Sequence, residues 1–279
     1  MTINGDRTEI GHYSVISLAG VGRVTEVYIG RDHYDNDLAI KIIKPEHLEN
    51  LHLIKGFHRC GLKMKKLIHP NIIECYDSDH IAHEMYYIAM EYVDGITLKY
   101  FIEKKSRIDV RQALSIAYSI AEALDYAHNE GIIHGELCPR NIMINRKGKV
   151  KVGDFGIARV VSETVTSCQL DSAEYMSMER VGDKPMSKED DIFSLGIIIF
   201  EMLTGRHPYN AKTPMTIWAD HYIQKNLPKL SEYIEDIDDH VDVIFRRCCK
   251  QDGVDPYESI RELKSDLLRA MMQDKQEKA

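Results

Sequence analysis

Apolar and polar residues alternate along the first part of the chain, and glycines separate the alternating segments. The clearest segments are 13–18, 26–30 and 38–43. Because successive side chains of a β-strand point to opposite faces, this pattern predicts three strands joined by tight turns. A helix is then predicted from Pro45 to about Leu67, and His69-Pro70-Asn71 ends it. Two more strands are expected near 72–76 and 85–92.

The spacing of the apolar residues changes to that of a helix after Asp94-Gly95. The positions that repeat every three or four residues are Leu98, Phe101, Ile102, Ala113, Leu114, Ile116, Ala117, Ile120, Ala121 and Leu124. They predict a long helical region, interrupted later by two short strands near 142–144 and 150–152. The sequence therefore predicts an α+β fold, in which a small β-rich lobe of about 90 residues precedes a larger helical lobe.

The longest apolar run and the two ends of the chain indicate whether a membrane span, a secretory signal or a frayed tail is expected. The run at 195–203 is too short to cross a bilayer and predicts a buried helix, so no membrane span is expected. Residues 1–9 are polar and mixed in charge, so they do not read as a secretory signal. Residues 273–279 form a charged tail that is expected to fray.

Composition and charge narrow the class of protein further. Of the 279 residues, 44% are hydrophobic and 29% are charged, which is typical of a globular protein and not of a disordered or fibrous one. The formal net charge of −8 argues against nucleic acid or an anionic membrane as the main partner, because these bind clustered Lys and Arg. The six cysteines include no C-x-x-C pair, so a reducing, cytoplasmic location is expected. His80 and His83 are spaced like metal ligands, but they lie in an expected loop without a carboxylate or cysteine motif, which favours an ordinary loop.

Two patterns in the predicted strands suit a nucleotide. Gly20-Val-Gly22-Arg-Val-Thr25-Glu-Val27 would let the backbone of a hairpin approach phosphates closely, although it also fits an ordinary β-turn. Lys41 follows Leu38-Ala39-Ile40 on a strand. Burying such a lysine is costly without an anion to pair with it, and the alternative is a surface lysine that extends its ammonium into water.

Two further motifs follow in the helical half. The first is His134-Gly135-Glu136-Leu137-Cys138-Pro139-Arg140-Asn141, and the second is Val152-Gly153-Asp154-Phe155-Gly156. The gap between them leaves room for one hairpin. Segments 172–179 and 191–196 follow in turn. In order and spacing these motifs resemble the glycine-rich loop, V-A-I-K, H-R-D-L-K-P-x-N, D-F-G and A-P-E motifs of protein kinases.

The resemblance to the protein kinase superfamily covers about Tyr13 to Leu268 and is strongest to the eukaryotic-like Ser/Thr kinases of bacteria. It implies a bilobal fold with an N-terminal extension at 1–12, an N-lobe at 13–93, a C-lobe at 94–270 and a charged tail at 271–279. It also implies that ATP and Mg²⁺ bind in the cleft between the lobes, and that the partner or substrate is another protein.

The resemblance assigns roles to individual residues. Gly20 and Gly22 would cover the phosphates, and Lys41 would bind them. The residues around the adenine would be Val27, Ala39 and Met143 as its walls, Met90 as gatekeeper, and Glu91 to Val93 as hinge. Asn141 and Asp154 would hold Mg²⁺, with Glu136 as the catalytic base and Asp191 bracing its loop. The spine that joins the lobes would be Met64, Cys75, His134 and Phe155.

The chain departs from the family pattern at the lysine. Counting back from His69-Pro70, the helix position that should supply a glutamate to Lys41 is Cys60. Glu49 is about three turns away and could substitute only if the helix were displaced. Lys41 is therefore expected to lack its carboxylate partner and to be less well oriented for phosphoryl transfer.

Two departures fall in the catalytic loop. Glu136 stands where the family has aspartate, and a misplacement of about 1 Å can cost ~10²-fold in rate. Cys138 replaces the lysine that neutralises the phosphoryl group, and losing such a stabiliser typically costs ~10²–10³-fold. No neighbouring cation is evident to lower the pKa of Cys138, so a buried, inert thiol is expected.

The remaining departures concern the activation segment. Gly135 removes the arginine that would bind a phosphorylated loop, so phosphate on that loop would lack this partner. The hydroxyl residues of the loop are Ser162, Thr164, Thr166 and Ser167. Met178 replaces the proline of A-P-E, and Pro256 sits where an arginine would pair with Glu179, so that buried ion pair is expected to be missing.

Three hypotheses of function follow. The first is a pseudokinase that binds ATP and acts in signalling as a scaffold or allosteric partner. The second is a slow Ser/Thr kinase that uses Glu136 as its base, which Ser172 favours because it stands where a threonine is typical of Ser/Thr specificity. The third is a small-molecule phosphotransferase, suggested by His134-Gly135 followed by an acid. The intact Asp-Phe-Gly and Ser-Leu-Gly segments argue against the third.

Overall fold

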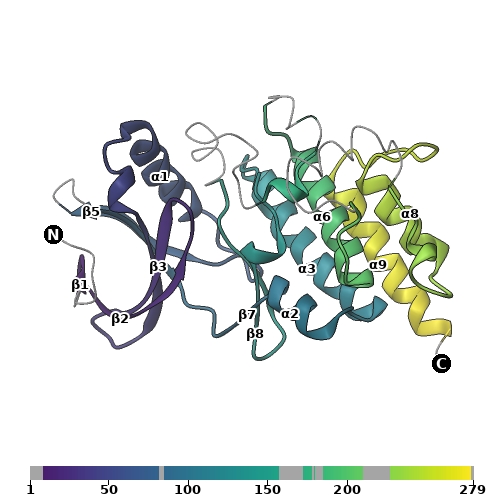
Figure 1. Cartoon of the computed structure of the whole chain (residues 1–279), viewed down its shortest axis with the longest axis horizontal. Helices are drawn as coiled ribbons and strands as arrows, with labels where there is room; N and C mark the ends of the chain where they lie inside the picture. Colours follow the sequence, from purple (N-terminus) through teal and green to yellow (C-terminus); the bar gives the residue numbers. More distant parts are fainter. Residues whose placement is uncertain are drawn as a thin grey trace.

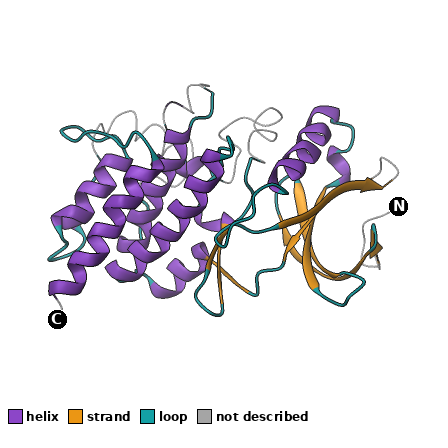
Figure 2. Ribbon diagram, turned by 180° about the vertical axis from the view of Figure 1, so that it is seen from behind, coloured by secondary structure: helices purple, strands orange, loops and turns teal. Residues whose placement is uncertain are grey.

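In the computed structural model the described residues are 9–81, 85–156, 172–177, 179, 185–209 and 227–277, with side chains as far as Gln273. Figure 1 shows a β-rich lobe that contains the N-terminus beside a larger helical lobe that contains the C-terminus. The predicted α+β, two-lobe architecture is confirmed. Seen from behind in Figure 2, one sheet lies at one end of the molecule with a helix packed against it, and a few short strands lie at the boundary with the helices.

The N-lobe is built on a six-stranded antiparallel sheet with the order β1-β2-β3-β4-β6-β5. Its strands are β1 (Glu9–Ile10), β2 (Tyr13–Val21), β3 (Thr25–Arg31), β4 (Asp37–Ile43), β5 (Cys75–Ile81) and β6 (Met85–Glu91). The three strands predicted from the alternation are β2, β3 and β4. The short strand β1 pairs with β2 and buries Ile10 completely, so part of the expected N-terminal extension belongs to the sheet.

Helix α1 (Leu51–Met64) is shorter than the helix predicted from Pro45 to Leu67. A separate 3₁₀ turn covers Pro45–His47, and the Asn50 side chain accepts a hydrogen bond from the amide of Leu53 at 3.1 Å. Such a cap satisfies amides at the start of a helix and therefore fixes where α1 begins.

The buried face of α1 lies directly against the sheet. A Cβ on Gly61 would overlap the hydroxyl of Ser78 on β5, so this glycine allows a close approach of helix and strand. The thiol of Cys75 also donates to the carbonyl oxygen of Gly61, at 3.6 Å. Helix α1 therefore packs against β5 through its backbone as well as through its side chains.

Strand β5 differs from its prediction. It was expected near 72–76, but it begins at Cys75 and continues through His80, which pairs with Tyr86 of β6. His80 therefore lies on a strand and not in a loop, and His83 falls outside the described residues. Pairing with β6 outweighs the low strand propensity of the Asp-rich sequence here.

A second, three-stranded sheet lies at the start of the helical lobe, with the order β7-β8-β9. Its strands are β7 (Gly95–Thr97), β8 (Ile142–Asn145) and β9 (Val150–Val152). The strand pair β8–β9 was predicted, whereas β7 is too short to show in the hydrophobic pattern. Beyond it follow α2 (Leu98–Lys105), α3 (Val110–Asn129), α6 (Lys188–Thr204), α8 (Asp239–Cys248) and α9 (Ile260–Glu277).

The core explains the helical part of the pattern. Helix α6 is buried continuously from Asp190 to Leu203, as expected of the apolar run. One hydrophobic cluster runs from α1 and the sheet through α3 and α6 to α9. Helix α9 continues to Glu277, so most of the segment expected to be a frayed tail is helical. Within the described ranges, no helix has both the length and the apolar character needed to span a bilayer.

Candidate functional site

The glycine-containing segment forms a tight hairpin between β2 and β3. The amide of Gly22 donates to the carbonyl oxygen of Thr25 at 2.8 Å, and Gly20 pairs with Val27. A Cβ placed on Gly20 would meet no atom within 4 Å, so the space beside this strand is open. The hairpin is thus compatible with a backbone lid over phosphates.

The register of the sheet brings the predicted nucleotide residues onto one face. Val27 pairs with Lys41, and Ala39 pairs with Met90. Because residues directly opposite in antiparallel strands share a face, and residues two apart on a strand do as well, these four side chains lie together.

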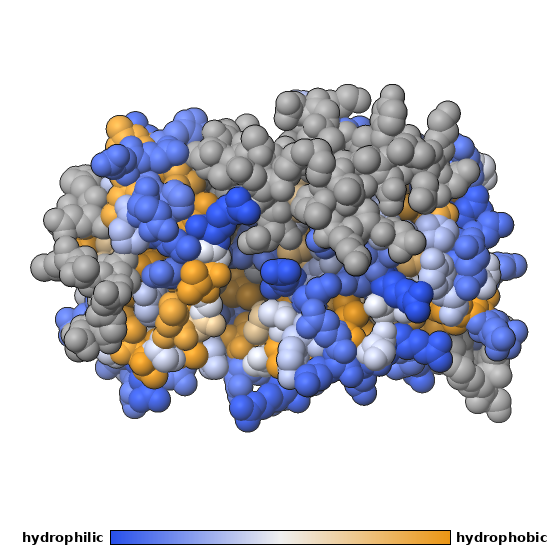
Figure 3. Space-filling model, in the orientation of Figure 1, coloured by the Kyte–Doolittle hydropathy of each residue, from blue (hydrophilic) through white to orange (hydrophobic). Residues whose placement is uncertain are grey.

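The opposite face of the same strands is closed. Leu38, Ile40 and Ile42 alternate with Ala39 and Lys41, and they are buried in a separate cluster. Val27, Ala39 and Met143 are only half-buried, as expected of apolar side chains that line an open cleft. Figure 3 shows apolar surface on the N-lobe reaching the boundary between the two lobes.

Lys41 and Asp154 come together in this cleft. The Lys41 ammonium donates to Oδ1 of Asp154 at 2.5 Å, and the two side chains are 10% and 25% exposed. The expectation that Lys41 lacks a carboxylate partner is therefore wrong. Asp154 supplies the carboxylate that the helix lacks, because the fold brings together two residues that are 113 positions apart in the sequence.

Cys60 occupies the helix position that faces the cleft. Its thiol donates to the carbonyl oxygen of Gly156 at 2.9 Å, and the residue is 6% exposed. Glu49 precedes α1 and is exposed, so the structure does not use it as a substitute. The contact between α1 and the Asp-Phe-Gly turn thus runs through a neutral thiol.

The Asp-Phe-Gly turn is held by the catalytic loop. Asp154 has a φ of 63° and Gly156 a φ of 71°. Left-handed backbone is unfavourable for an aspartate, so neighbouring contacts must hold it. The Phe155 ring packs on the His134 ring at 4.7 Å between centroids, and the Gly156 amide donates to the His134 carbonyl oxygen at 3.3 Å. The predicted spine residues Met64, Cys75, His134 and Phe155 are all buried.

Asp191 braces the catalytic loop, as expected. Its carboxylate accepts hydrogen bonds from the amides of His134, at 2.9 Å, and Gly135, at 2.8 Å. The His128 ring lies 2.7 Å from the same carboxylate. Gly135 has a φ of 76°, a left-handed conformation that glycine adopts without a Cβ clash. Burial lowers the pKa of His134, against the opposing effect of Asp191.

Asn141 and Asp154 fit a magnesium site. The Asn141 side-chain amide donates to the carbonyl oxygen of Glu136 at 2.8 Å, which leaves its oxygen as an acceptor. The amide of Gly153 donates to the Asn141 carbonyl oxygen at 2.9 Å, so the two predicted ligands are held close together. No group of three or more His, Cys, Asp or Glu side chains suited to a metal occurs in the described part of the chain. Two side-chain oxygens completed by phosphates and water are typical of Mg²⁺.

Cys138 is the buried thiol that the sequence predicts. It is 2% exposed, and burial raises its pKa to about 12. A thiol with such a pKa stays protonated at neutral pH and supplies no positive charge to a phosphoryl group. Glu136, its neighbour in the loop, is half-buried.

The segment that resembles A-P-E, at 172–179, makes polar contacts that the sequence did not indicate. Glu179 forms an ion pair with Lys250 at 2.8 Å, and both side chains are more than a third exposed. Lys250 thus supplies the positive charge that Pro256 cannot supply. The buried ion pair of the family is therefore replaced by a partly exposed one with a different cation. The buried hydroxyl of Tyr175 donates to Glu201 at 2.6 Å. The other predicted residues of the activation segment, Met178 and the hydroxyls at 162, 164, 166 and 167, lie outside the described residues.

Glu91, which the sequence predicts to lie in the hinge, has a side-chain partner that the sequence did not indicate. Its carboxylate accepts from the Lys151 ammonium at 2.6 Å. The only sequence signal was a lysine between two valines on a predicted strand, the same signal that singled out Lys41.

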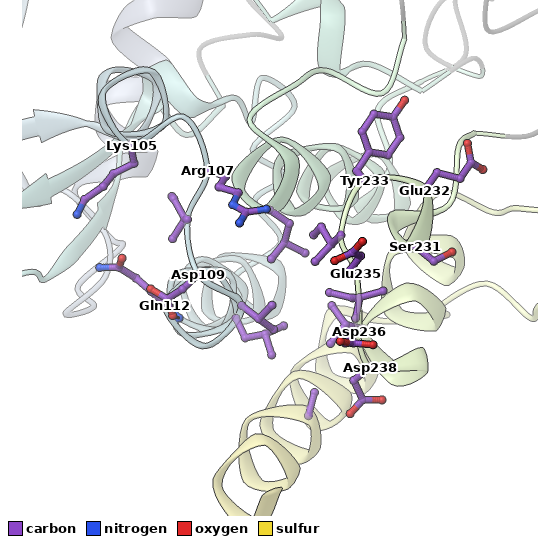
Figure 4. A pocket seen from close by; sticks show the side chains of 18 residues that line it. Lys105, Arg107, Asp109, Gln112, Ser231, Glu232, Tyr233, Glu235, Asp236 and Asp238 are labelled. Atoms are coloured by element: carbon purple, nitrogen blue, oxygen red, sulfur yellow. Dashed lines mark hydrogen bonds between the residues drawn. The ribbon is translucent and has the colours of Figure 1, made fainter. Parts of the chain in front are cut away.

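A cavity of about 1080 Å³ lies elsewhere, in the helical lobe, and Figure 4 shows its lining. Lys105 and Arg107 come from one side and the carboxylates of Glu235, Asp236 and Asp238 from the other. None of the predicted site residues lines it, so it is separate from the interlobe cleft.

Comparisons with known proteins agree with the motifs. A family model described as the protein kinase domain matches residues 13–278. The chain is 33% identical over 269 residues to the Ser/Thr protein kinase PrkC of Bacillus subtilis, covering 95% of this chain and 41% of that protein. It is 30% identical over 272 residues to the Ser/Thr protein kinase PknB of Mycobacterium leprae, covering 95% and 43%. The chain thus spans about two fifths of the length of these relatives.

A solved structure shows the same fold. The kinase domain of Mycobacterium tuberculosis PknI superposes with a TM-score of 0.75 at 22% sequence identity, covering 95% of this chain and 99% of that one.

Proposed function

Because the chain belongs to the protein kinase domain family, we propose that it binds ATP in the interlobe cleft and transfers phosphate slowly or not at all, acting in signalling as a pseudokinase. The observation that carries this proposal is the pairing of Lys41 with Asp154 while Cys60 occupies the helix position. The groups that hold a nucleotide are retained, whereas those that drive the chemistry are replaced.

Binding is supported by the arrangement of the cleft. Val27 and Ala39 above and Met143 below offer apolar walls for an adenine, and the hinge backbone offers polar groups at its edge. Lys41 supplies the positive charge for phosphates, and Asn141 and Asp154 supply oxygens for Mg²⁺. When bound, Mg²⁺ would neutralise phosphate charge.

Impaired transfer is supported by the catalytic loop. Lys41 has no carboxylate on α1 to hold it toward phosphates, so it would have to divide its hydrogen bonds between Asp154 and the nucleotide. Cys138 is neutral and buried, so the developing charge of a phosphoryl group would lack the usual lysine. Glu136 carries its carboxylate one methylene further than aspartate would.

A slow Ser/Thr kinase is the second candidate, and the intact frame of the catalytic loop favours it. Asp191 holds the loop with two backbone hydrogen bonds, and the His134–Phe155 contact preserves the spine. In this case Glu136 would accept the proton of the substrate hydroxyl from a retracted rotamer.

The partner and location are parts of the same proposal. We place the protein in the cytoplasm, because no disulfide joins the buried cysteines Cys75, Cys138, Cys248 and Cys249. Its partner or substrate would be a protein.

A thermal-shift titration with ATP, with and without Mg²⁺, tests the binding. A ligand at 100 times its dissociation constant stabilises a protein by ~2.7 kcal/mol, which raises the unfolding midpoint measurably. Asp154→Asn should remove the part of the shift that depends on Mg²⁺. An unchanged midpoint for the unmodified protein at millimolar ATP would contradict nucleotide binding.

Incubation with labelled ATP and a generic basic protein separates the two candidates. A pseudokinase leaves the basic protein unlabelled. Label above the background of a Glu136→Gln variant would favour the slow kinase.

A further inference from the structure

Lys151 is a buried lysine at the junction of the two lobes. Its side chain is 11% exposed, and its ammonium donates to the Glu91 carboxylate at 2.6 Å and to the Ile72 carbonyl oxygen at 3.1 Å. Glu91 ends β6 in the hinge, Ile72 lies in the connection after α1, and Lys151 is in β9. One side chain thus joins three segments that come from both lobes.

The alternation of β8 and β9 explains why this lysine points toward the hinge. Ile142 pairs with Val152 and Ile144 pairs with Val150, and three of these four side chains are fully or almost fully buried in the main core. Lys151 pairs with Met143, so both point to the other face. The lysine therefore shares its face with the residue proposed as the floor for adenine.

The backbone around this lysine is closely connected. The Val152 amide donates to the Asn71 carbonyl oxygen and the Ile73 amide to the Val152 carbonyl oxygen, each at 2.8 Å. On the hinge side, the Glu91 amide donates to the Glu74 carbonyl oxygen at 2.8 Å, and the Glu91 carboxylate accepts from the Glu74 amide at 3.2 Å. Lys151 connects these two sets of hydrogen bonds.

A charge in this position is costly unless it is paired. Both members of the Lys151–Glu91 pair are largely removed from water, at 11% and 26% exposure, and their geometry compensates the desolvation with a short ion pair. Removing one member leaves the other without its counter-charge, which favours a shift of the hinge that exposes the remaining group to water. The lysine therefore constrains where the hinge backbone lies.

We propose that Lys151 is a positioning residue that holds the hinge against β9 and thereby couples the adenine end of the cleft to its metal end at Asp154. Strand β9 leads through Gly153 directly into Asp154, so a displacement of the hinge and a displacement of the Asp-Phe-Gly turn are mechanically linked. The effect on ligand affinity rests on the proposed nucleotide binding, whereas the effect on the hinge does not.

Equilibrium binding of adenosine and of a non-hydrolysable ATP analogue tests the coupling. The variants are Lys151→Met, Glu91→Gln and the double variant, with Lys149→Met as the control, because Lys149 is exposed on the same hairpin. Coupled neighbours show interaction energies that correspond to ~2- to 150-fold in affinity. We expect Lys151→Met to weaken both ligands ~10-fold within that range, the double variant to be no weaker than the worse single one, and Lys151→Arg to recover part of the loss. Additive losses, or a Lys151→Met variant equal to the control, would overturn the proposal.

Hydrogen–deuterium exchange of the ligand-free protein provides a test that does not need a nucleotide. Lys151→Met should increase exchange at both the hinge, 91–93, and the segment 152–154, while Lys149→Met leaves both unchanged. Faster exchange throughout the protein, or no change at the hinge, would refute the positioning role. If the unmodified protein bound no nucleotide while the exchange result held, the proposed function would fail and the hinge link would stand.

Discussion

The thiol of Cys60 donates a hydrogen bond to the carbonyl oxygen of Gly156 at 2.9 Å, across the cleft between α1 and the Asp-Phe-Gly turn. In the family pattern a glutamate at this helix position would pair with Lys41. Here the helix contacts the turn itself, and the lysine pairs with Asp154 from that turn. The position of α1 and the position of Asp154 are therefore linked without a helix carboxylate.

Replacing Cys60 tests this link. Cys60→Ala should destabilise the protein by ~1–2 kcal/mol, because it removes a buried side chain and leaves the Gly156 carbonyl without this donor. Cys60→Ser keeps a donor and should recover part of the loss in urea unfolding. A serine variant less stable than the alanine variant would argue that the pocket requires an apolar group and not a donor.

Replacing Lys41 tests the placement of the phosphates. Lys41→Ala should weaken ATP binding ~10-fold or more, because a charge-assisted hydrogen bond contributes about 1.5–3 kcal/mol. The thermal shift produced by ATP would shrink, and Lys63→Ala, on the exposed side of α1, should leave it intact. The same shift in wild type and Lys41→Ala would mean that the phosphates lie elsewhere.

Restoring the family residues tests the cause of the impairment. The triple change Cys60→Glu, Glu136→Asp and Cys138→Lys should raise phosphoryl transfer to a basic protein well above wild type. Cys60 and Cys138 are 6% and 2% exposed, so each new charge must find a partner in the cleft. The new glutamate would share the Lys41 ammonium with Asp154, to which that ammonium already donates. A folded triple variant without any gain in labelled product would locate the impairment elsewhere.

Two histidines, the buried His134 and the half-buried His207, contribute to the pH dependence of stability. Burial lowers the pKa of both His134 and His207 below 6.5. At mildly acidic pH each histidine therefore binds fewer protons in the folded chain than in the unfolded chain. The free energy of unfolding should therefore be highest above pH 6.5 and fall as the pH drops below it. Urea unfolding at pH 7.5, 6.5 and 5.5 would measure this.

A variant separates these histidines from other titrating groups. His134→Phe keeps a ring against Phe155 and removes the titrating group, so its stability should depend less on pH over the same range. An identical pH profile for the variant and the wild type would assign the loss to other residues.

Much of the cleft was predictable because its residues belong to contiguous motifs on strands. Once β3 and β4 are assigned, the two-residue period puts Ala39 and Lys41 on one face of β4, and the pairing of Val27 with Lys41 adds Val27 to that face. Asp191, His134 and Phe155 could likewise be placed, because their motifs have fixed spacing. Residues whose position is set by a contiguous motif can therefore be predicted from the sequence.

The partners of charged residues were not predictable in the same way. Lys41 and Asp154 are 113 positions apart, and their pairing depends on how the lobes meet. Glu179 was matched to Pro256 by motif counting, but Lys250 reaches it from a nearby turn. Side-chain reach across two elements decides such pairs, and hydrophobic periodicity carries no information on it.

The close seating of α1 on β5 limits how this protein could be regulated. Since Gly61 leaves no room between the helix and Ser78, α1 cannot roll about its own axis without lifting off the strand. A protein that displaced α1 would therefore be expected to move β5 with it, and its binding surface should include strands as well as the helix.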